Sequence, residues 1–334
     1  MAQSIVVVGS SNTDMIIKLD RIPKPGETCL GGEFITAAGG KGANQAVAAA
    51  RAGGAVTLIA RVGQDMFGER AVAGLTQYGI NVEHVQYDES PSGVALIFVG
   101  KDGENSIGVA SGANAKLSPA DVQQAKSAFD SADVVIMQLE TPLATVRAAA
   151  DLAHANGALV ILNPAPAQPL PDALLKMVSI LTPNEIEVEL LTGIEVNDEA
   201  SCGLAADILL RKGIETVIIT LGSRGSFVAS ADQKQLVPGF KVTQVDTTAA
   251  GDTFNGTLAV ALSEGKSMFD AVRFANAAGA VAVTRMGAQP SAPNRTEIEK
   301  LVDGEKSLAF DDRSAAHIQN LHMHSRSRKS ARVT

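Results

Sequence analysis

Short, nearly continuous apolar runs are the feature that most constrains the fold of this chain. They are IVVV (5–8), VVIM (134–137), ALVIL (158–162) and TVIIT (216–220). Runs rich in valine and isoleucine without polar alternation are typical of strands that are covered on both faces, as in parallel sheets. The sequence therefore predicts a central sheet with other structure packed on each side.

Helical patterns separate these runs. In the stretch LSPADVQQAKSAF, Ser118 is placed to cap a helix and Pro119 to occupy its first position. Further helices are predicted at 142–154, 197–212, 251–263 and 266–284. This alternation predicts an α/β fold with an open, mostly parallel, doubly wound sheet and helices on both faces. The ligand crevice of such a fold lies beyond the carboxyl ends of the strands.

Two stretches interrupt the alternation. Residues 12–40 and 91–112 read as strands joined by Pro/Gly and Asp-Gly turns, and neither has room for a crossover helix. We expect a small antiparallel β flap, which acts as a lid or as a pairing surface between subunits; surface hairpins without a function are the alternative. The remaining segments, predicted to form the body, are 1–11, 41–90 and 113–304. The polar, basic segment 305–334 is expected to be a disordered tail.

Charge and cysteine content exclude several classes of function. The formal net charge of −8 argues against a general nucleic-acid binder, because phosphate neutralisation needs clustered Lys and Arg. Cys29 and Cys202 lie far apart and outside any CxxC pattern, so we expect neither a disulfide framework nor a zinc site, and a cytoplasmic location. No stretch of about eighteen consecutive apolar residues occurs, so no membrane span is expected.

The common phosphate-binding motifs are absent. In GGKGAN, Lys41 is followed by Gly42 rather than by Ser or Thr, so this stretch is not a Walker loop, and no GxGxxG occurs. Before the tail the only histidines are His84 and His154, and neither lies beside a motif. Histidine-based acid/base chemistry is therefore not expected.

The segment VDTTAAGDTFNG (245–256) offers a different anion site. Its residues 249–252 directly precede an apolar helical pattern, which places their backbone N–H groups at a helix N-terminus, where anions bind. A carboxylate beside an anion pocket is electrostatically unfavourable. One interpretation of Asp252 is therefore a base that accepts the proton of a hydroxyl attacking phosphorus. The alternative is that aspartate simply favours the first turn of any helix.

Seven stretches, in this order, resemble the ribokinase (PfkB) family of carbohydrate kinases. They are GGKGANQAVAAARAG (39–53), MQLE (137–140), NPAPA (163–167), TPNEIE (182–187), TLGSRG (220–225), DTTAAGDTFNG (246–256) and VTRMGAQPS (283–291). The resemblance extends from about residue 4 to about residue 302. It implies transfer of the γ-phosphoryl group of ATP to a sugar, with Mg²⁺ and an activating K⁺. The expected reaction is phosphorylation of D-ribose to D-ribose 5-phosphate.

The resemblance also implies roles for individual residues. The general base would be Asp252, and the N–H groups of Ala249, Ala250 and Gly251 would hold the transferred phosphoryl group. Residues that resemble sugar contacts are Asn12, Asp14, Gly40, Lys41, Asn44, Glu140 and Asp252. Residues that resemble nucleotide contacts are Asn184, Thr220, Gly222, Ser223, Gly225, Gly251 and Asn276. Residues that resemble a monovalent-cation site are Asp246, Thr248, Ala282, Arg285, Gly287 and Ser291. Glu187 resembles an acid that organises Mg²⁺ through water.

Each of these residues, taken singly, also has a plain structural interpretation. Asn12 and Asp14 follow a strand end, Lys41 could be a solvated residue at a helix start, and Glu187 could lie on a helix surface. As a set they suit a sugar, because carboxylates and amides can accept both protons of a vicinal diol while a lysine and glycine N–H groups donate.

Two other functions stay open at this point. One is a kinase of another pentose or of a nucleoside. Nucleosides are disfavoured because aromatic residues make up 4% of the chain, tryptophan is absent, and Phe34 is the one candidate platform for a base near the sugar motif. The other is a sensor of sugar or nucleotide without catalysis, which would have no need for Asp252. The resemblance further implies a homodimer that pairs through the flaps.

Overall fold

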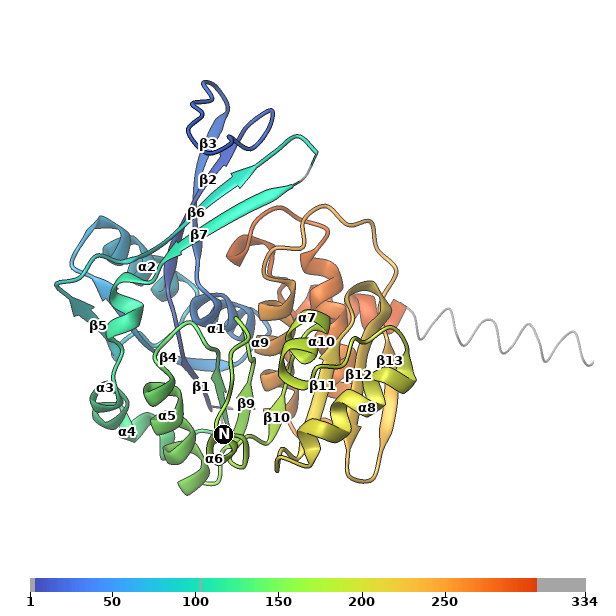
Figure 1. The fold of residues 1–334 in the computed structure, drawn as a ribbon. Helices are drawn as coiled ribbons and strands as arrows, with labels where there is room; N and C mark the ends of the chain where they lie inside the picture. The colour runs from blue at the N-terminus through green and yellow to red at the C-terminus, as the bar shows by residue number, and fades with distance from the viewer. Residues whose placement is uncertain (1–3, 103, 305–334) are drawn as a thin grey trace, which may run out of the picture.

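A nine-stranded sheet runs through the centre of the chain (Figure 1), in the order β13-β12-β11-β10-β9-β8-β1-β4-β5. The computed structural model describes residues 4–102 and 104–304, so the predicted tail lies outside the described residues. The strands are β1 (Ser4–Val8), β4 (Ala55–Gly63), β5 (Val85–Asp88), β8 (Val134–Met137), β9 (Leu159–Leu162), β10 (Ile180–Leu181), β11 (Thr216–Thr220), β12 (Gly225–Ser230) and β13 (Lys234–Pro238). Neighbours from β5 to β11 are parallel, and β12 and β13 extend the sheet antiparallel.

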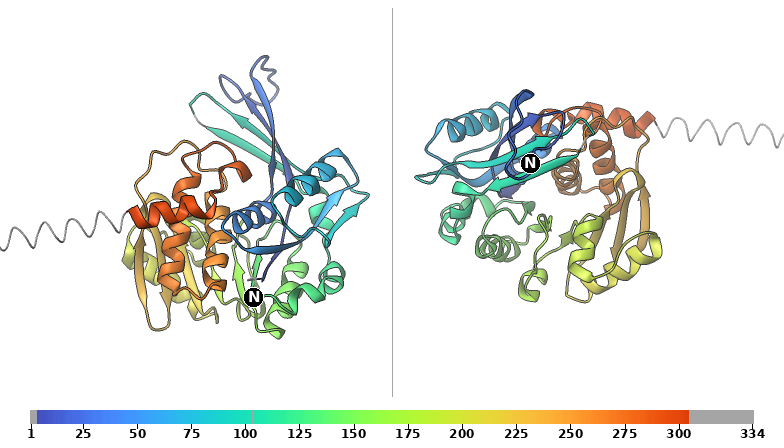
Figure 2. Two further views of the ribbon diagram at one scale, coloured as in Figure 1. Left: turned by 180° about the vertical axis from the view of Figure 1, so that it is seen from behind. Right: turned by 45° about the horizontal axis from the view of Figure 1, so that its top comes forward.

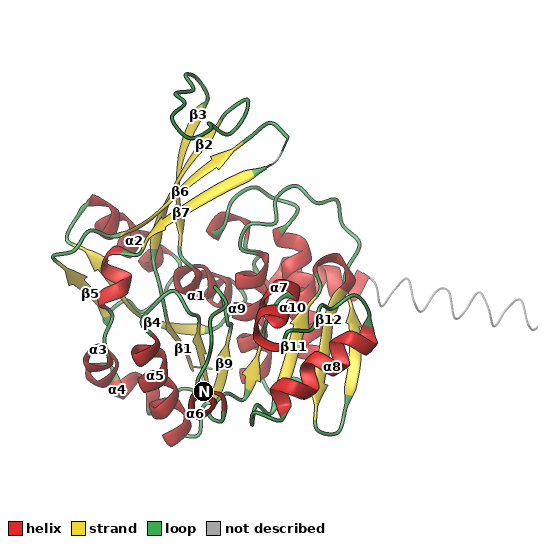
Figure 3. Ribbon diagram, viewed as in Figure 1, coloured by secondary structure: helices red, strands yellow, loops and turns green. Residues whose placement is uncertain are grey.

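The helices cover both faces of this sheet (Figures 2 and 3). They are α1 (Lys41–Arg51), α2 (Met66–Gln77), α3 (Pro119–Gln124), α4 (Lys126–Phe129), α5 (Leu143–Ala155), α6 (Asp172–Leu175), α7 (Glu185–Thr192), α8 (Glu199–Leu210), α9 (Ala250–Ser263) and α10 (Met268–Ala282). Short 3₁₀ helices in the described residues are η1 (Gly112–Lys116), η2 (Gly222–Arg224) and η3 (Gln289–Ser291). Ser118 caps α3 as predicted, but the expected single helix is split into α3 and α4 at Ala125.

Strand alternation divides the interior into two cores. On β1, Ile5 and Val7 belong to the core that contains residues of α1, α9 and α10, whereas Val6 and Val8 belong to the core that contains residues of α5 and α8. Because successive side chains of a strand point to opposite faces, a run that is apolar at every position needs a cover on each side. The prediction of a doubly wound α/β sheet is confirmed.

The sheet has a topological switch point between β1 and β8. From β1 the chain proceeds to β4 and β5 on one side, and from β8 to β9, β10 and β11 on the other. The connections that leave the carboxyl ends of β1 and β8 therefore diverge to opposite sides. A crevice for ligands is expected at such a point.

The flap is a separate four-stranded sheet, in the order β3-β2-β6-β7, that projects from the body (Figure 1). Its strands are β2 (Asn12–Lys18), β3 (Glu33–Gly39), β6 (Gly93–Val99) and β7 (Asn105–Ala110). Both hairpins are antiparallel, and a parallel pairing of β2 with β6 joins them, with Asn12 opposite Gly93. The turn signals of the sequence define each hairpin, but they carry no information about which of its strands meets the other hairpin.

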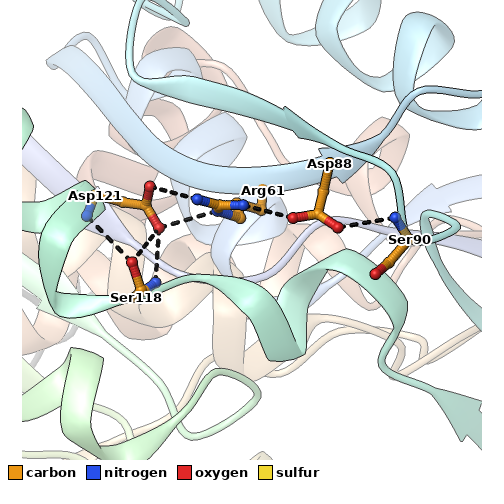
Figure 4. A network of polar contacts seen from close by, with 5 residues as sticks. All are labelled: Arg61, Asp88, Ser90, Ser118 and Asp121. Carbon is orange, nitrogen blue, oxygen red and sulfur yellow. Dashed lines mark hydrogen bonds and ion pairs between the residues drawn. The ribbon is translucent and has the colours of Figure 1, made fainter.

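An ion-pair network ties the base of the flap to the body (Figure 4). Arg61 of β4 donates through Nε and Nη2 to the carboxylate of Asp121 in α3, at 2.9 and 2.8 Å, and through Nη1 to Asp88 at the end of β5. Asp88 also accepts from the N–H of Ser90. Since Asp88 precedes β6 and Asp121 follows β7, one guanidinium holds the chain on both sides of this hairpin.

No helix in the described part of the chain has both the length and the apolar character that crossing a membrane requires.

Helix α1 packs closely against α9 because residue 256 is a glycine. A Cβ added to Gly256 would lie 2.4 Å from the carbonyl oxygen of Gln45 and 2.8 Å from the Cβ of Ala48. Gly256 lies four residues after Asp252, so both are on the same face of α9. The crossing therefore brings the first turn of α1 against the aspartate.

We expect Gly256→Ala to lower the free energy of unfolding by about 1–3 kcal/mol, because the extra carbon forces two packed helices apart. Urea unfolding would measure the change. The matched control is Gly74→Ala in α2, where a Cβ would meet no atom within 4 Å. That change is expected to leave stability equal or higher, by at most about 1 kcal/mol. Equal stabilities for Gly256→Ala and the unmodified chain would contradict the close crossing.

Candidate active site

The crevice at the switch point gathers side chains that are far apart in the sequence. Asn44 of α1 donates from Nδ2 to Oδ2 of Asp252 in α9 at 3.0 Å. Glu140, which follows β8, accepts at Oε2 from the backbone N–H of Lys41 at 3.0 Å. The pKa of Asp14 is raised to about 6 by burial first, and then by the charges of Glu140 and Asp252. Contacts and charges thus place these predicted sugar residues around one point.

Asp252 is a buried carboxylate that two amides hold from different sides. It is 6% exposed, and its Oδ1 accepts from Nε2 of Gln45 at 2.9 Å while its Oδ2 accepts from Asn44. Burial raises the pKa of Asp252 above its ordinary value, against the lowering effects of Lys41 and of the two amides. A carboxylate that is poorly solvated and firmly oriented can accept a proton from a hydroxyl placed beside it.

Gln45 belongs to a chain of buried amides that sequence reasoning missed. Its Nε2 also donates to Oδ1 of Asn163 at 3.2 Å, and its Oε1 accepts from Nε2 of Gln138 at 2.7 Å. Gln45 and Gln138 are 0% and 1% exposed. A signal was present in the sequence, because Gln45 is a polar residue at the start of the alanine-rich run AVAAA, which packs as a buried helix.

Lys41 supplies a positive charge among these acids. Burial acts to lower the pKa of Lys41, but the carboxylates of Asp252, Glu140 and Glu187 outweigh it and leave the pKa above its usual value. The charged ammonium form of Lys41 is therefore favoured by its surroundings. Lys41 is half-buried at the start of α1 and lines the small cavity described below.

Gly40 allows the start of α1 to approach β2. It is the N-cap of α1 with φ 87°, in the region that favours glycine. A Cβ at this residue would lie 2.7 Å from the backbone nitrogen of Asn12. Glu140 fastens the same turn, since its Oε2 accepts both from the hydroxyl of Ser10 and from the N–H of Lys41. Gly40 and Glu140 thus have structural tasks in addition to their predicted contact with a sugar.

The N-terminus of α9 differs in one respect from the predicted anion pocket. The N–H of Ala250 donates to the carbonyl of Thr247 at 3.2 Å. Within residues 4–102 and 104–304, no hydrogen-bond acceptor faces the N–H groups of Ala249, Gly251 and Asp252. The N–H groups that remain available to an anion are therefore those of Ala249, Gly251 and Asp252. Ala249, with φ 57°, turns the chain into the helix.

A small cavity of about 210 Å³ lies over this helix end. Its lining combines the N-terminus of α9 with Lys41, Glu187 and Asp252. Helix N–H groups, the positive end of the helix dipole and an ammonium group favour an anion there. The carboxylate of Asp252 is the exception, and its presence is what a group that removes a proton beside a phosphate requires.

A larger cavity of about 570 Å³ adjoins the small one. The two share part of their lining, including Thr220, Ala250 and Gly251. All seven residues that were predicted to contact a nucleotide line the larger cavity. They are Asn184, Thr220, Gly222, Ser223, Gly225, Gly251 and Asn276.

Two of these seven residues have their polar atoms engaged within the protein. Asn276 accepts from the hydroxyl of Ser226 at 2.7 Å and donates to the carbonyl of Val237 at 3.1 Å. Asn184 caps α7 and accepts from the N–H of Glu187 at 2.8 Å. Both residues shape the cavity wall as well as line it.

One wall of the larger cavity is apolar, and sequence reasoning missed it. Phe240, Val242, Phe254, Ala280 and Val283 contribute to this wall. They come from the loop before α9, from α9 itself and from the end of α10. No motif marks single apolar residues of this kind, so only the packing of these segments reveals them. Such a wall suits the flat face of a ligand.

Glu187 is buried, which excludes the interpretation of a solvated helix-surface residue. It is 9% exposed and lines the small cavity. Its Oε2 accepts from the N–H of Asn184 at 2.9 Å, completing a capping box at the start of α7. Burial raises the pKa of Glu187, while that hydrogen bond and Lys41 act to lower it.

Asp246 joins two loops that carry the predicted cation residues. Its Oδ1 accepts from the N–H and the hydroxyl of Thr248, at 2.9 and 2.6 Å, and its Oδ2 accepts from the N–H of Gly287 at 2.8 Å. Partial burial acts to raise the pKa of Asp246, but these hydrogen bonds hold it below the ordinary value. Asp246 is therefore a firmly ionised carboxylate beside the start of α9.

The other predicted cation residues offer backbone carbonyls and the hydroxyls of Thr248 and Ser291. The guanidinium of Arg285 forms an ion pair with Glu297, so only its carbonyl is suited to a cation. The carbonyl of Ala282 accepts from the N–H of Arg285 at 3.1 Å. Ser291 is fully buried, and its hydroxyl donates to the carbonyl of Ala288.

The register of the flap bears on the nucleoside alternative. Asp14 pairs with Ala37, and Ile17 pairs with Phe34. Because paired residues share a face and successive residues alternate, Phe34 lies on the face opposite to Asp14. The aromatic ring that could have stacked on a base is therefore directed away from the sugar residues.

The chain is similar to known carbohydrate kinases both in sequence and in structure. A model of the pfkB family of carbohydrate kinases matches residues 2–295. The chain is 49% identical to a ribokinase of Haemophilus influenzae over 298 residues, which cover 89% of this chain and 97% of that protein. A ribokinase structure from Thermotoga maritima superposes with a TM-score of 0.82 at 38% identity, covering 90% of this chain and 99% of that one. A structure of Arabidopsis thaliana ribokinase complexed with ribose and ATP gives a TM-score of 0.83 at 35% identity, with 90% and 99% coverage.

The raised pKa of Asp14 predicts a pH-dependent effect of Asp14→Asn on stability. The pKa is about 6 in the folded chain, against an ordinary value of 3.8. The contribution of this carboxyl to stability is therefore fully present below pH 3.8 and is lost as the pH rises through 6. We expect Asp14→Asn to raise the free energy of unfolding by about 1–3 kcal/mol above pH 7 and to have little effect near pH 3.8.

Urea unfolding at several pH values measures this difference in the absence of ligands. Asp130→Asn, at an exposed position, is the control and should change stability little at any pH. A stabilisation by Asp14→Asn that is independent of pH would contradict the assigned cause.

Proposed function

Because the chain belongs to the pfkB family of carbohydrate kinases, we propose that it transfers the γ-phosphoryl group of ATP to the 5-hydroxyl of D-ribose. The observation that carries the proposal is the buried carboxylate of Asp252 at the mouth of α9, next to Lys41 and to N–H groups that have no acceptor among the described residues. The three similar proteins named above are ribokinases, which supports ribose as the sugar.

Asp252 acts as the general base in this proposal. It takes the proton of the 5-hydroxyl as that oxygen bonds to the γ-phosphorus, and the bond from the γ-phosphorus to the bridging oxygen of ADP breaks. Asn44 and Gln45 orient the carboxylate by holding one oxygen each. A sensor without catalysis would gain nothing from this arrangement, because the charge of Asp252 weakens the binding of a phosphate.

The charge that develops on the transferred group is stabilised by fixed donors. The N–H groups of Ala249, Gly251 and Asp252 lack protein acceptors among the described residues, and Lys41 lines the same cavity. Donors that are already oriented need no reorganisation during the reaction. Loss of one such donor costs roughly 10²–10³ in rate.

The sugar site is supported by an unsatisfied buried acceptor. Oδ1 of Asn44 is buried without a hydrogen-bond partner among the described residues, a state that is costly unless a ligand supplies a donor. A sugar hydroxyl is such a donor. Asp14, Lys41 and Glu140 complete a polar site that would discriminate against analogues lacking a hydroxyl.

The residues of the small cavity fit Mg²⁺ held mainly by phosphate and water. The described part of the chain contains no cluster of three or more His, Cys, Asp or Glu side chains suited to a metal. Glu187 has one carboxylate oxygen in its capping box and a second that can accept from water. Mg²⁺ commonly keeps several waters and few protein ligands. When bound, it supplies charge neutralisation between the phosphates of ATP.

The loops around Asp246 fit a monovalent cation, for which we propose K⁺. An ionised carboxylate, backbone carbonyls and a hydroxyl are oxygen donors that suit a large, weakly hydrated ion. Asp246, Thr248, Ala282, Arg285, Gly287 and Ser291 would hold the ion. The loop that contains Asp246 leads directly into α9. A cation that orders this loop would therefore fix the direction of the N–H groups of Ala249, Gly251 and Asp252.

We further propose a homodimer that pairs through the outer face of the flap, and a cytoplasmic location. Phe34 and Leu96 are 64% and 51% exposed, and the register places both on the face opposite to Asp14. Exposed large apolar side chains favour association. Ile107 and Val109 of β7, 55% and 54% exposed, add two more on the Asp14 face of the flap. Both cysteines are free thiols, which suits a reducing compartment.

Asp252→Asn is the direct test of the base. We expect kcat to fall by about 10²–10⁴, because the amide cannot accept the proton, while the affinity for ribose changes much less. ADP release in the presence of pentoses and nucleosides would measure turnover and sugar preference together. Asp121→Asn, which removes a buried carboxylate from the Arg61 network, is the control and should affect stability more than kcat. Full turnover by Asp252→Asn would refute the assignment.

Potassium dependence tests the cation site. Replacement of K⁺ by a large organic cation at constant ionic strength is expected to lower kcat, because the loop before α9 loses an ordering ligand. Asp246→Asn should reduce the ratio of the rates with and without K⁺. If both cations support the same rate in the unmodified chain, the cation assignment is wrong.

A further inference from the structure

The roots of the flap meet at a buried pair of asparagines, Asn12 and Asn114. Asn12 begins β2, Gly93 begins β6, and Asn114 lies in η1 just after β7. The two asparagines are 7% and 2% exposed. A Cβ on Gly93 would lie 2.2 Å from both Oδ1 of Asn12 and Nδ2 of Asn114. Glycine at position 93 therefore leaves room for the contact between the two amides. Any larger residue there would displace one of them.

Backbone groups determine the direction of the Asn114 amide. The N–H of Ser11 can only donate, and it donates to Oδ1 of Asn114 at 2.9 Å. The carbonyl of Ser11 can only accept, and it accepts from Nδ2 of Asn114 at 3.1 Å. If the Asn114 amide were reversed, its NH₂ group would face the N–H of Ser11 and its oxygen would face the carbonyl of Ser11, so neither hydrogen bond could form. The backbone of Ser11 thus fixes the orientation of the Asn114 amide.

The direction of Asn114 in turn determines that of Asn12. Nδ2 of Asn114 also donates to Oδ1 of Asn12 at 2.7 Å, so the end of Asn12 that faces Asn114 must be its oxygen. Among the described residues, no protein group accepts from Nδ2 of Asn12. The free end of Asn12 therefore carries donors only.

We propose that Asn114 is a positioning residue that sets sugar recognition, by forcing Asn12 to present N–H donors to the substrate. The inference rests on the proposed function, because it assumes that Asn12 contacts the sugar. Asn12 and Asp14 are two residues apart on β2 and so share a face. Donors on Asn12 beside acceptors on Asp14 match neighbouring hydroxyls, of which one accepts while the other donates.

A double-mutant cycle tests the coupling. Asn12→Ala and Asn114→Ala are each expected to raise the KM for ribose roughly tenfold, the effect of about one hydrogen bond, without a similar change in the KM for ATP. The double variant should be no worse than Asn12→Ala alone, because Asn114 acts through Asn12. Calorimetric ribose binding gives the same cycle without turnover.

Two further variants reverse the polarity of the site and keep its shape. In Asn114→Asp the side chain facing Asn12 becomes an acceptor, so Asn12 must turn its oxygen toward the sugar. In Asn12→Asp the acceptor for Asn114 is kept, but the free end loses its donors. Both are expected to raise the KM for ribose more than Asn114→Ala does. These variants keep the test informative if Asn114→Ala fails to fold.

Ser92→Ala is the matched control at the same junction. Ser92 is also buried at the root of β6, where its hydroxyl donates to Asp65 and accepts from the N–H of Gly63. Among the described residues no hydrogen bond joins Ser92 to Asn12, so its effect on the KM for ribose should multiply with that of Asn12→Ala. If the effects of Asn114→Ala and Asn12→Ala on the KM for ribose also multiply in the double variant, the inference is wrong. Asn114 then only supports the flap.

Failure of the proposed function gives a different result. If the unmodified chain phosphorylates another sugar, ribose is wrong, and the cycle is measured with that sugar. If it phosphorylates no sugar, the proposed function fails, and the inference fails with it. Turnover of ribose together with multiplicative effects of Asn12 and Asn114 overturns only the inference.

Discussion

The close crossing of α1 and α9 is the contact on which the candidate site depends. Gly256 lets the backbone of α1 approach α9, and one turn earlier on the same face Asp252 receives the amides of Asn44 and Gln45. A charged carboxylate would otherwise be unstable at 6% exposure. Two neutral donors orient it without neutralising it, whereas an ion pair in direct contact would make it a weaker base.

Lys41 offsets part of the electrostatic repulsion in the crevice, since it interacts with Asp252, Glu140 and Glu187. Asp14, Glu140, Glu187 and Asp252 all lie within reach of one another's charge or of this lysine. The chain therefore gives up stability to keep acids together, as is common where function requires it. Binding of a sugar, whose hydroxyls donate to these acids, would relieve part of that cost.

The flap is attached to the body by polar groups, and among the described residues neither apolar core includes a residue of its strands. Arg61 with its two aspartates holds the β6–β7 hairpin, and Asn114 holds the start of β2. Hydrogen bonds have directions, unlike apolar contacts, so this attachment also controls which polar atoms face the crevice. Asn114 in this way both supports the flap and fixes the direction of the Asn12 amide.

The sequence alone determined the sheet, its two-sided cover, the two hairpins and the segment that would carry the acid, because apolar periodicity, turn residues and helix starts are local properties. It also suggested which polar residues would gather around a sugar and a nucleotide. Only the tertiary structure decided that β2 pairs with β6 and that Phe34 faces away from Asp14. It also decided that Gln45, which Gln138 contacts, donates to Asp252, and that the N–H of Ala250 donates to the carbonyl of Thr247. These facts depend on strand partners, helix crossings and register, which are set by contacts between residues far apart in the chain.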